Sequence, residues 1–257
     1  MSMWQRSLLL ALLAAPPAAH AAQPAAPPAP APLSARAAAP VDLSGYWVSL
    51  VTQNWQFRMV VPMKGDYGGI PINRKAKDQA DAWSAAADEA AGLACKAYGA
   101  GNIMRIPARL RMSWSDEQTL QVEVDAGRQT RVLHFVPVGR EAPDDGTGPS
   151  WQGRTAARWE NPATARNPAV PGGSGSLELH TDHLLPGLLR KNGVPYGAQA
   201  HLAEYWETSN EGGDTWLTVT TVLDDPEYLR GSYIINSIYR KERDGSRWNP
   251  SDCTLKQ

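Results

Sequence analysis

The sequence has few of the residues and motifs on which catalytic predictions usually depend. It contains five histidines and two cysteines among 257 residues, and its formal net charge is −1. No nucleophile elbow, phosphate-binding loop, His-Glu-x-x-His motif or dinucleotide fingerprint occurs in it. The nearly balanced charge, with both signs mixed along the chain, argues against nucleic acid as a partner. We expect no cofactor.

A long apolar run is also missing, except at the start of the chain. Arg6 precedes an apolar segment at residues 7–15, and the small residues of Ala19-His20-Ala21 fit a cleavage site. A membrane anchor is the alternative, but the segment is too short and Pro16-Pro17 follows it at once. We therefore predict a signal peptide at 1–21, no membrane span after its cleavage, and a periplasmic or secreted protein.

The next segment, residues 22–40, consists almost entirely of alanine and proline. Such a composition has little to bury and favours extended conformations, so it predicts a disordered linker. The remaining residues, 41–257, are few enough for one domain.

The only two cysteines are Cys95 and Cys253. A single pair in an exported protein predicts a disulfide, which would hold the C-terminal tail on the domain. A redox or metal-binding thiol is the alternative, although no Cys-x-x-Cys motif or neighbouring histidine cluster supports it.

Strand patterns dominate the domain. In residues 119–125 the apolar side chains of Leu120, Val122 and Val124 alternate strictly with polar ones, as in a half-buried antiparallel hairpin. About nine or ten strands in sequence order favour an antiparallel meander that closes into a barrel and so removes its exposed edges. The predicted strands are 46–52, 56–61, 110–115, 119–125, 128–136, 153–160, 176–184, 200–208, 216–223 and 233–242.

One helix interrupts these strands. Asn73 can cap a run of good helix formers that continues to Ala91, and Gly92 is placed to end it. Ala76, Ala80 and Trp83 recur at helical spacing. The helix is either a lid over the barrel or a simple packing element.

Gly45-Tyr46-Trp47 at the first strand resembles the Gly-x-Trp signature of the lipocalin (calycin) superfamily. The resemblance implies an antiparallel barrel of about 8–10 strands, here with one inserted helix. It also implies an arginine from a late strand packed on the tryptophan, a favourable cation–π contact, and Arg240 stands at the matching position.

A second resemblance covers roughly the C-terminal half of the domain. It is to a family of secreted bacterial proteins, and it implies export and the same fold but no particular activity. Arg154-Thr155 depart from the usual start of that pattern. The residues that carry the resemblance are 151–160, 189–196, 202–206 and 222–228.

Glu160 and Glu204 are the first candidates for catalysis. Each adjoins aromatic side chains, Trp159 in one case and Tyr205-Trp206 in the other. Desolvation by such neighbours raises the pKa of a carboxyl group and suits it to acid–base catalysis. The alternative is structural: Glu204 is solvated or pairs with an internal arginine such as Arg158.

Histidines supply the other candidates. His180 and Asp182 would share one face of a strand, whereas His183 would point to the opposite face. A metal site of His180, Asp182 and either His201 or Glu204 is conceivable, but ordinary polar residues at a strand end explain the pattern equally well. We predict no metal, and we retain His180 and His183 as possible proton-transfer partners.

The segment Leu189–Tyr196 is a basic turn with Asn192-Gly193 at its tip. It is either a simple hairpin loop, since Asn-Gly is a strong two-residue turn signal, or a binding loop. In the second case Arg190, Lys191 and Tyr196 would hold an acidic ligand at the barrel mouth.

Two functions are compatible with these patterns. The first is an exported barrel that binds a small, largely apolar or aromatic ligand in its interior, where barrels of this size can hold one. Its expected ligand-binding residues are Arg158, Trp159, Arg190, Lys191, Tyr196, Tyr205 and Trp206. The second is a cofactor-independent lyase, hydratase or isomerase that acts on an aromatic or terpenoid-like substrate through Glu160, His180, His183 and Glu204.

Overall fold

The structure is a computed structural model, and it describes residues 33–144, 146–163, 167 and 175–255. The predicted signal peptide at 1–21 and the linker up to Pro32 lie outside the described residues. Residues 34–38, which the sequence assigned to the linker, contact the barrel. Their contacts include hydrogen bonds from Ser34 Oγ to Glu117 and from Trp159 Nε1 to the carbonyl oxygen of Ala35.

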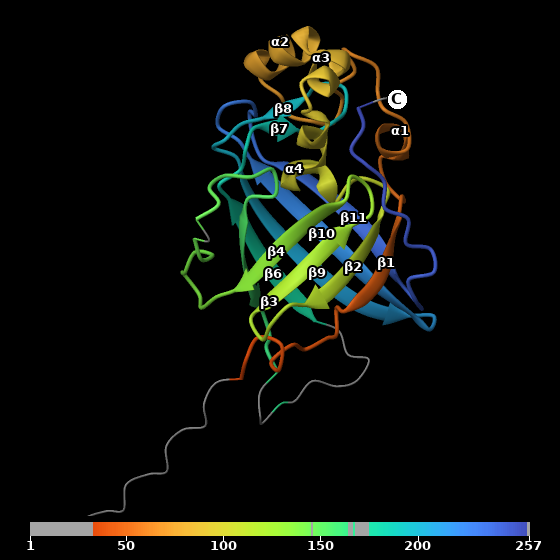
Figure 1. Cartoon of the computed structure of the whole chain (residues 1–257), viewed down its shortest axis with the longest axis vertical. Coiled ribbons are helices and arrows are strands. Elements are labelled where there is room, and N and C mark those ends of the chain that lie inside the picture. Colours follow the sequence, from red (N-terminus) through yellow and green to blue (C-terminus); the bar gives the residue numbers. More distant parts are fainter. Residues whose placement is uncertain (1–32, 145, 164–166, 168–174, 256–257) are drawn as a thin grey trace, which may run out of the picture. The chain divides into compact units, whose positions relative to one another are not determined.

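The fold is mainly β, as predicted, and its centre is a closed barrel of nine strands (Figure 1). Around the barrel the strands follow the order β1-β11-β10-β9-β6-β5-β4-β3-β2. Their bounds are β1 Gly45–Leu50, β2 Arg109–Trp114, β3 Thr119–Val124, β4 Gln129–Phe135, β5 Arg154–Trp159, β6 Ser176–Asp182, β9 His201–Glu211, β10 Asp214–Asp224 and β11 Tyr233–Glu242.

The expected all-antiparallel pairing is wrong at one place. Strands β4 and β5 pair in parallel, with Leu133 opposite Thr155 and Phe135 opposite Ala157. Residues 136–153 between them must return to the starting end of the barrel, as parallel neighbours require. The barrel is therefore mixed, and the alternation within each strand could not reveal this because it carries no information about strand direction.

The half-buried strand β3 has the predicted alternation. Leu120 and Val122 are fully buried and Val124 nearly so, whereas Gln121 and Glu123 are only partly buried. The turn that the predicted hairpin requires after β3 is also present, with Gly127 at φ 78°.

The predicted strand at 56–61 is wrong. Asn54 adopts a left-handed backbone conformation (φ 52°), and the chain then forms one helical turn, α1 (Trp55–Arg58). Met59 and Val60 beyond it are exposed. Without a neighbouring strand to pair with, the β propensity of these residues does not determine their conformation.

The predicted helix at 73–91 is present but consists of two helices. Helix α2 (Arg74–Ala82) ends at Trp83, which has an extended backbone, and α3 (Ala85–Ala90) begins at a new cap, Ser84. The Ser84 side chain accepts a hydrogen bond from the backbone N–H of Ala87 and so favours a fresh start.

Asn73 caps α2 as the sequence predicts, since its side-chain oxygen accepts a 3.0 Å hydrogen bond from the backbone N–H of Ala76. We expect Asn73→Ala to lower the free energy of unfolding by about 1 kcal/mol, because one backbone donor loses its partner. Urea unfolding followed by far-UV circular dichroism measures this. Asn73→Ser keeps an acceptor for the Ala76 N–H and, like Asn73→Ala, loses the 2.8 Å bond from Asn73 Nδ2 to Glu227 O, so equal losses in the two variants would contradict the capping role.

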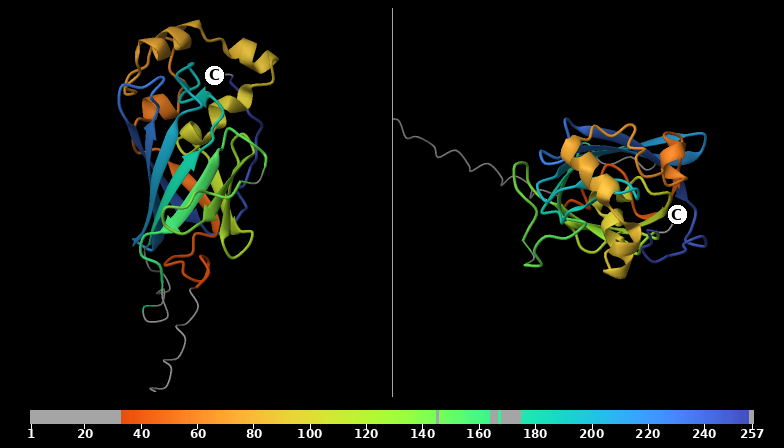
Figure 2. Two further views of the ribbon diagram at one scale, coloured as in Figure 1. Left: turned by 90° about the vertical axis from the view of Figure 1, so that its left-hand side faces the viewer. Right: turned by 90° about the horizontal axis from the view of Figure 1, so that it is seen from above.

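The helices and a short hairpin gather at one end of the barrel, which we call the helical end (Figure 1; Figure 2, right). All of these helices, α1 included, belong to the long connection between β1 and β2. The insertion therefore holds more than the single helix that was predicted. The remaining elements there are the 3-10 helix η1 (Ala94–Tyr98), α4 (Ala100–Ile103) and the hairpin of β7 (Gly187–Leu188) with β8 (Pro195–Tyr196).

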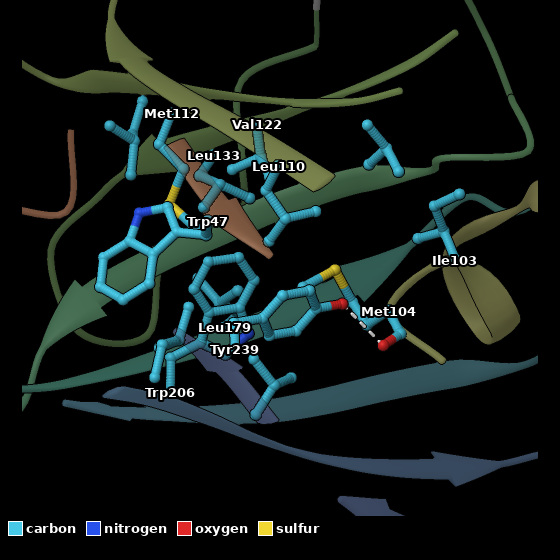
Figure 3. Close-up of a cluster of buried hydrophobic side chains, with 14 of the residues drawn as sticks. Trp47, Ile103, Met104, Leu110, Met112, Val122, Leu133, Leu179, Trp206 and Tyr239 are labelled. Carbon is cyan, nitrogen blue, oxygen red and sulfur yellow. Dashed lines mark hydrogen bonds between the residues drawn. The ribbon is translucent and has the colours of Figure 1, made fainter. Parts of the chain in front are cut away.

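Large side chains fill the barrel interior (Figure 3). Trp47 and Tyr239 are fully buried and Trp206 almost so, and aliphatic residues from most of the strands pack around them. The Tyr239 hydroxyl donates a 2.7 Å hydrogen bond to the carbonyl oxygen of Met104, next to α4, and so ties the core to the helical end.

The predicted packing of Arg240 on Trp47 is wrong. Strand β11 places Lys241 opposite Trp47 in the pairing with β1, and the Lys241 ammonium lies 5.4 Å from the indole ring centre. Arg240 points outward and lies 3.7 Å from Asp214. The cationic partner is thus one position later than expected, because successive strand residues face opposite sides.

The predicted disulfide between Cys95 and Cys253 is confirmed. It joins η1 at the helical end to the tail that follows β11. In the part of the chain that the structure describes, no helix is both long and apolar enough to cross a bilayer.

Candidate functional site

A cavity of about 310 Å³ lies at the helical end of the barrel. Three separate segments form its wall: the stretch from Phe57 to Pro62 after β1, the stretch from Asn102 to Pro107 at the end of α4, and the pair Arg190-Lys191 between β7 and β8. We call it the mouth cavity. Its size is at the lower end of the range of small-molecule sites.

Each of these segments contributes one arginine to the mouth cavity: Arg58, Arg105 and Arg190. Arg105 and Arg190 are each only 4% exposed. Charged side chains are rarely buried to this degree unless they are paired, so their surroundings decide what the cavity can do.

The three guanidinium groups keep several nitrogen atoms without a hydrogen-bond partner among the described residues. These atoms are Nη2 of Arg58, Nη2 of Arg105, and both Nε and Nη1 of Arg190, and all are shielded from solvent. The partners that do exist are neutral: Arg58 Nε donates to the carbonyl oxygen of Arg105 at 2.8 Å, and Arg105 Nη1 donates to Leu189 O at 3.1 Å.

No carboxylate oxygen of the described residues lies within 4 Å of these three side chains. Burial lowers the pKa of the Arg105 guanidinium, and the positive charges of Arg190 and Arg58 lower it further although Tyr233 opposes them. Arginine nevertheless stays protonated at neutral pH. The cavity therefore concentrates positive charge that no carboxylate of the described residues neutralises.

The Arg190 side chain lies over the ring of Phe57, with 4.2 Å between the guanidinium carbon and the ring centre. This contact orients the guanidinium on an apolar surface. Phe57, Val60 and Ile106 supply apolar wall beside the charged groups. The mouth cavity thus offers both a cationic and an apolar surface to a ligand.

The turn that carries Arg190 is held firmly. The Leu189 N–H donates to Val194 O at 2.7 Å, and Gly193 takes a left-handed conformation (φ 96°) that other residues rarely adopt. Asn192 Nδ2 donates to the carbonyl oxygens of Met63 and Asp66, and so joins this turn to the chain just beyond Pro62. The loop is longer than the predicted two-residue turn, since the pairing of β7 with β8 ends where Leu188 lies opposite Pro195.

The other two residues predicted at the barrel mouth lie nearby. Lys191 lines the cavity, and its ammonium donates a 2.7 Å hydrogen bond to the Tyr98 hydroxyl. Tyr196 is fully buried among the apolar residues of the helical end and does not line the cavity. Burial raises the pKa of its hydroxyl.

Glu204 lies inside the barrel and is fully buried. Arg131 of β4 donates from Nη1 to Glu204 Oε1 at 3.1 Å and from Nη2 to Oε2, and Thr221 donates at 3.4 Å. Nη2 of Arg131 also contacts Thr181 Oγ1 at 3.3 Å. The structural alternative named Arg158 as the partner, but the partner is Arg131, because both side chains face inward from opposing parts of the wall.

Arg158 lies on the outer wall of the barrel beside Glu178, which is only 8% exposed, and the exposed His180. Arg158 Nε donates to Glu178 Oε2 at 2.7 Å, and His180 Nε2 lies 2.8 Å from Glu178 Oε1. Burial acts to raise the pKa of Glu178, but the hydrogen bonds from Arg158 and His180 outweigh it and hold the pKa below its usual value.

These outer-wall residues border a second cavity, of about 260 Å³, with the loop 136–142. Two of its lining arginines have carboxylate partners: Arg158 pairs with Glu178, and Arg154 pairs with Asp144, outside the lining, at 2.9 Å. These two arginines thus differ from those of the mouth cavity.

The remaining predicted residues lie apart from one another. Glu160 is exposed, and His183 is exposed with its Nδ1 at 2.6 Å from Asp182. Trp159 and Trp206 belong to the buried core, whereas Tyr205 is 38% exposed on the outside. Inward-facing Glu204 and outward-facing His180 are thus on opposite sides of the wall, and nowhere in the described ranges are three His, Cys, Asp or Glu side chains grouped as a metal site requires.

Two residues of the mouth cavity, Arg58 and Arg105, were not predicted from the sequence. Each is a single basic residue within an apolar run, Phe57-Arg58-Met59 and Met104-Arg105-Ile106. A cation enclosed by apolar neighbours is the only local signal, and it is equally typical of a solvated turn.

Comparison of the chain with known protein families, curated proteins and solved structures gave no match.

Proposed function

We propose that the protein binds a small organic anion in the mouth cavity, with its acidic group on Arg58, Arg105 and Arg190 and its apolar part against Phe57, Val60 and Ile106. The observation that carries the proposal is the set of buried guanidinium nitrogens that have no partner in the part of the chain that the structure describes. A buried charge without a counter-charge costs stability, and a bound anion would remove that cost.

The mouth cavity is a better position for a ligand than the barrel interior that the sequence favoured. Trp47 and Trp206 fill the centre of the barrel together with aliphatic side chains. Placing the ligand at the mouth keeps the expected binding roles of Arg190 and Lys191, and it adds Arg58 and Arg105. A ligand there needs no rearrangement of the core.

An enzymatic role has less support. Among the candidate acid–base residues, Glu204 is engaged by Arg131, and Glu160 and His183 are exposed and line neither of the two cavities described above. The mouth cavity contains cations and no carboxylate or histidine in its described lining. Its chemistry suits anion binding more directly than proton transfer.

Replacement of Arg190 tests the proposal. The probe is 8-anilinonaphthalene-1-sulfonate, which joins an aromatic body to one sulfonate and gains fluorescence in apolar sites. We expect the unmodified protein to bind it and Arg190→Met to bind it about tenfold more weakly or worse, because a buried charge–charge contact is lost. The methionine keeps much of the apolar volume.

Two comparisons make the result specific. Arg240→Met changes an arginine on the outer barrel wall whose side chain is 42% exposed, and it should leave probe binding unchanged. The free energy of unfolding of Arg190→Met without ligand should be equal to or higher than that of the unmodified protein, since an unpaired buried charge is removed. Equal probe affinity in Arg190→Met and the unmodified protein would refute the proposal.

A further inference from the structure

We infer that the ligand's acidic group carries two negative charges, as a phosphate or phosphonate monoester does, rather than the single charge of a carboxylate. This inference rests on the proposed function and concerns the class of ligand that the same site accepts.

The charge balance of the mouth cavity is the first argument. Arg58, Arg105 and Arg190 bring three positive charges to the cavity, and Lys191 adds a fourth, whose hydrogen-bond partner, the Tyr98 hydroxyl, is neutral. Within the described residues no carboxylate lies within ion-pair distance of any of them. A single negative charge would leave most of this positive charge uncompensated in a site of low polarity, where like charges repel strongly.

The number and origin of the free donors are the second argument. Four buried nitrogens on three different segments have no acceptor within the described ranges. A carboxylate has two oxygens in one plane, whereas a phosphoryl group presents three oxygens arranged around its phosphorus. A phosphoryl group can therefore accept from donors that arrive from three directions, and arginine is the side chain that most often recognises it.

The apolar wall indicates that the anion is an ester or phosphonate with an organic part. Phe57, Val60, Ile106 and Pro107 line the same cavity as the arginines. Inorganic phosphate would leave this surface uncovered, whereas an aryl or short alkyl group would bury it, which favours binding. A volume of about 310 Å³ accommodates such a monoester.

Isothermal titration calorimetry of the whole protein with matched probes tests the inference. Phenyl phosphate is the dianionic probe at about pH 8, since the second pKa of a phosphate monoester is about 6. Methyl phenyl phosphate keeps the ring and the phosphorus but carries one charge, and benzoate is the planar monoanion. We expect phenyl phosphate to bind about tenfold more tightly than either monoanion, a difference that Arg105→Met and Arg190→Met each reduce.

The outcomes separate this inference from the proposed function. Equal affinity for all three probes, with every affinity reduced by Arg190→Met, would overturn the double charge and leave anion binding intact. Binding that neither arginine variant alters, or no binding of any probe, would overturn both. Arg240→Met serves again as the control with unchanged titrations.

Discussion

Replacing both cysteines of the Cys95–Cys253 bridge with serine should lower the free energy of unfolding by about 5 kcal/mol. The two residues are 158 positions apart, and closing so long a loop removes much of the freedom of the unfolded chain. Stability is measured by urea unfolding under non-reducing conditions, with fluorescence of the buried tryptophans as the signal.

The same measurement with a reducing agent provides the control. Reduction should destabilise the unmodified protein to the level of the double variant and leave the double variant unchanged. A loss below about 1 kcal/mol would contradict the chain-entropy argument and would indicate that the tail remains closely packed in the unfolded chain. The hydrogen bond from Arg128 to Asp252 beside the bridge is exposed and too weak to substitute for it.

Glu204→Gln should be the most damaging single change in the barrel, with a loss of about 3–5 kcal/mol in the free energy of unfolding. The substitution keeps the size of the side chain, but it leaves Arg131 fully buried without a counter-charge. Urea unfolding measures the loss. The dependence of the unfolding free energy on urea concentration (the m-value) should stay that of the unmodified protein.

Two further variants identify the cause. The double change Arg131→Met with Glu204→Leu removes both charges and should recover most of the stability, because apolar groups of similar volume can replace a buried ion pair. Asp252→Asn breaks an exposed pair with Arg128 and should cost less than about 1 kcal/mol. If Glu204→Gln is no worse than Asp252→Asn, the buried pair does not hold the barrel wall together.

The sequence predicted those parts of the fold that depend on local pattern. Alternation of Leu120, Val122 and Val124 reports which face of one strand is buried, and the Asn73 cap is a contact between residues three positions apart. The parallel pairing of β4 with β5 depends instead on the path of the connection at 136–153. A helical turn likewise replaced the predicted strand at 56–61, because no strand edge was available there.

The candidate site shows the same division. Arg190 and Lys191 stood out because they occur in a turn-forming loop, where binding residues are common. Arg58 and Arg105 gave no such signal, since the chemistry of the site arises only when segments 47 residues apart meet. The partner of Glu204 was equally out of reach, because Arg131 is 73 residues away along the chain and faces it only across the closed barrel.

The position of β1 has a consequence for the order of assembly. This first strand pairs with β2 on one side and with the last strand, β11, on the other. While the chain is being synthesised, both β1 and the growing sheet therefore keep an unpaired edge until Tyr233–Glu242 has emerged. Closure links the two ends of the domain in a single late step, a topology typical of slow folding, and an unpaired edge is prone to aggregation in the meantime.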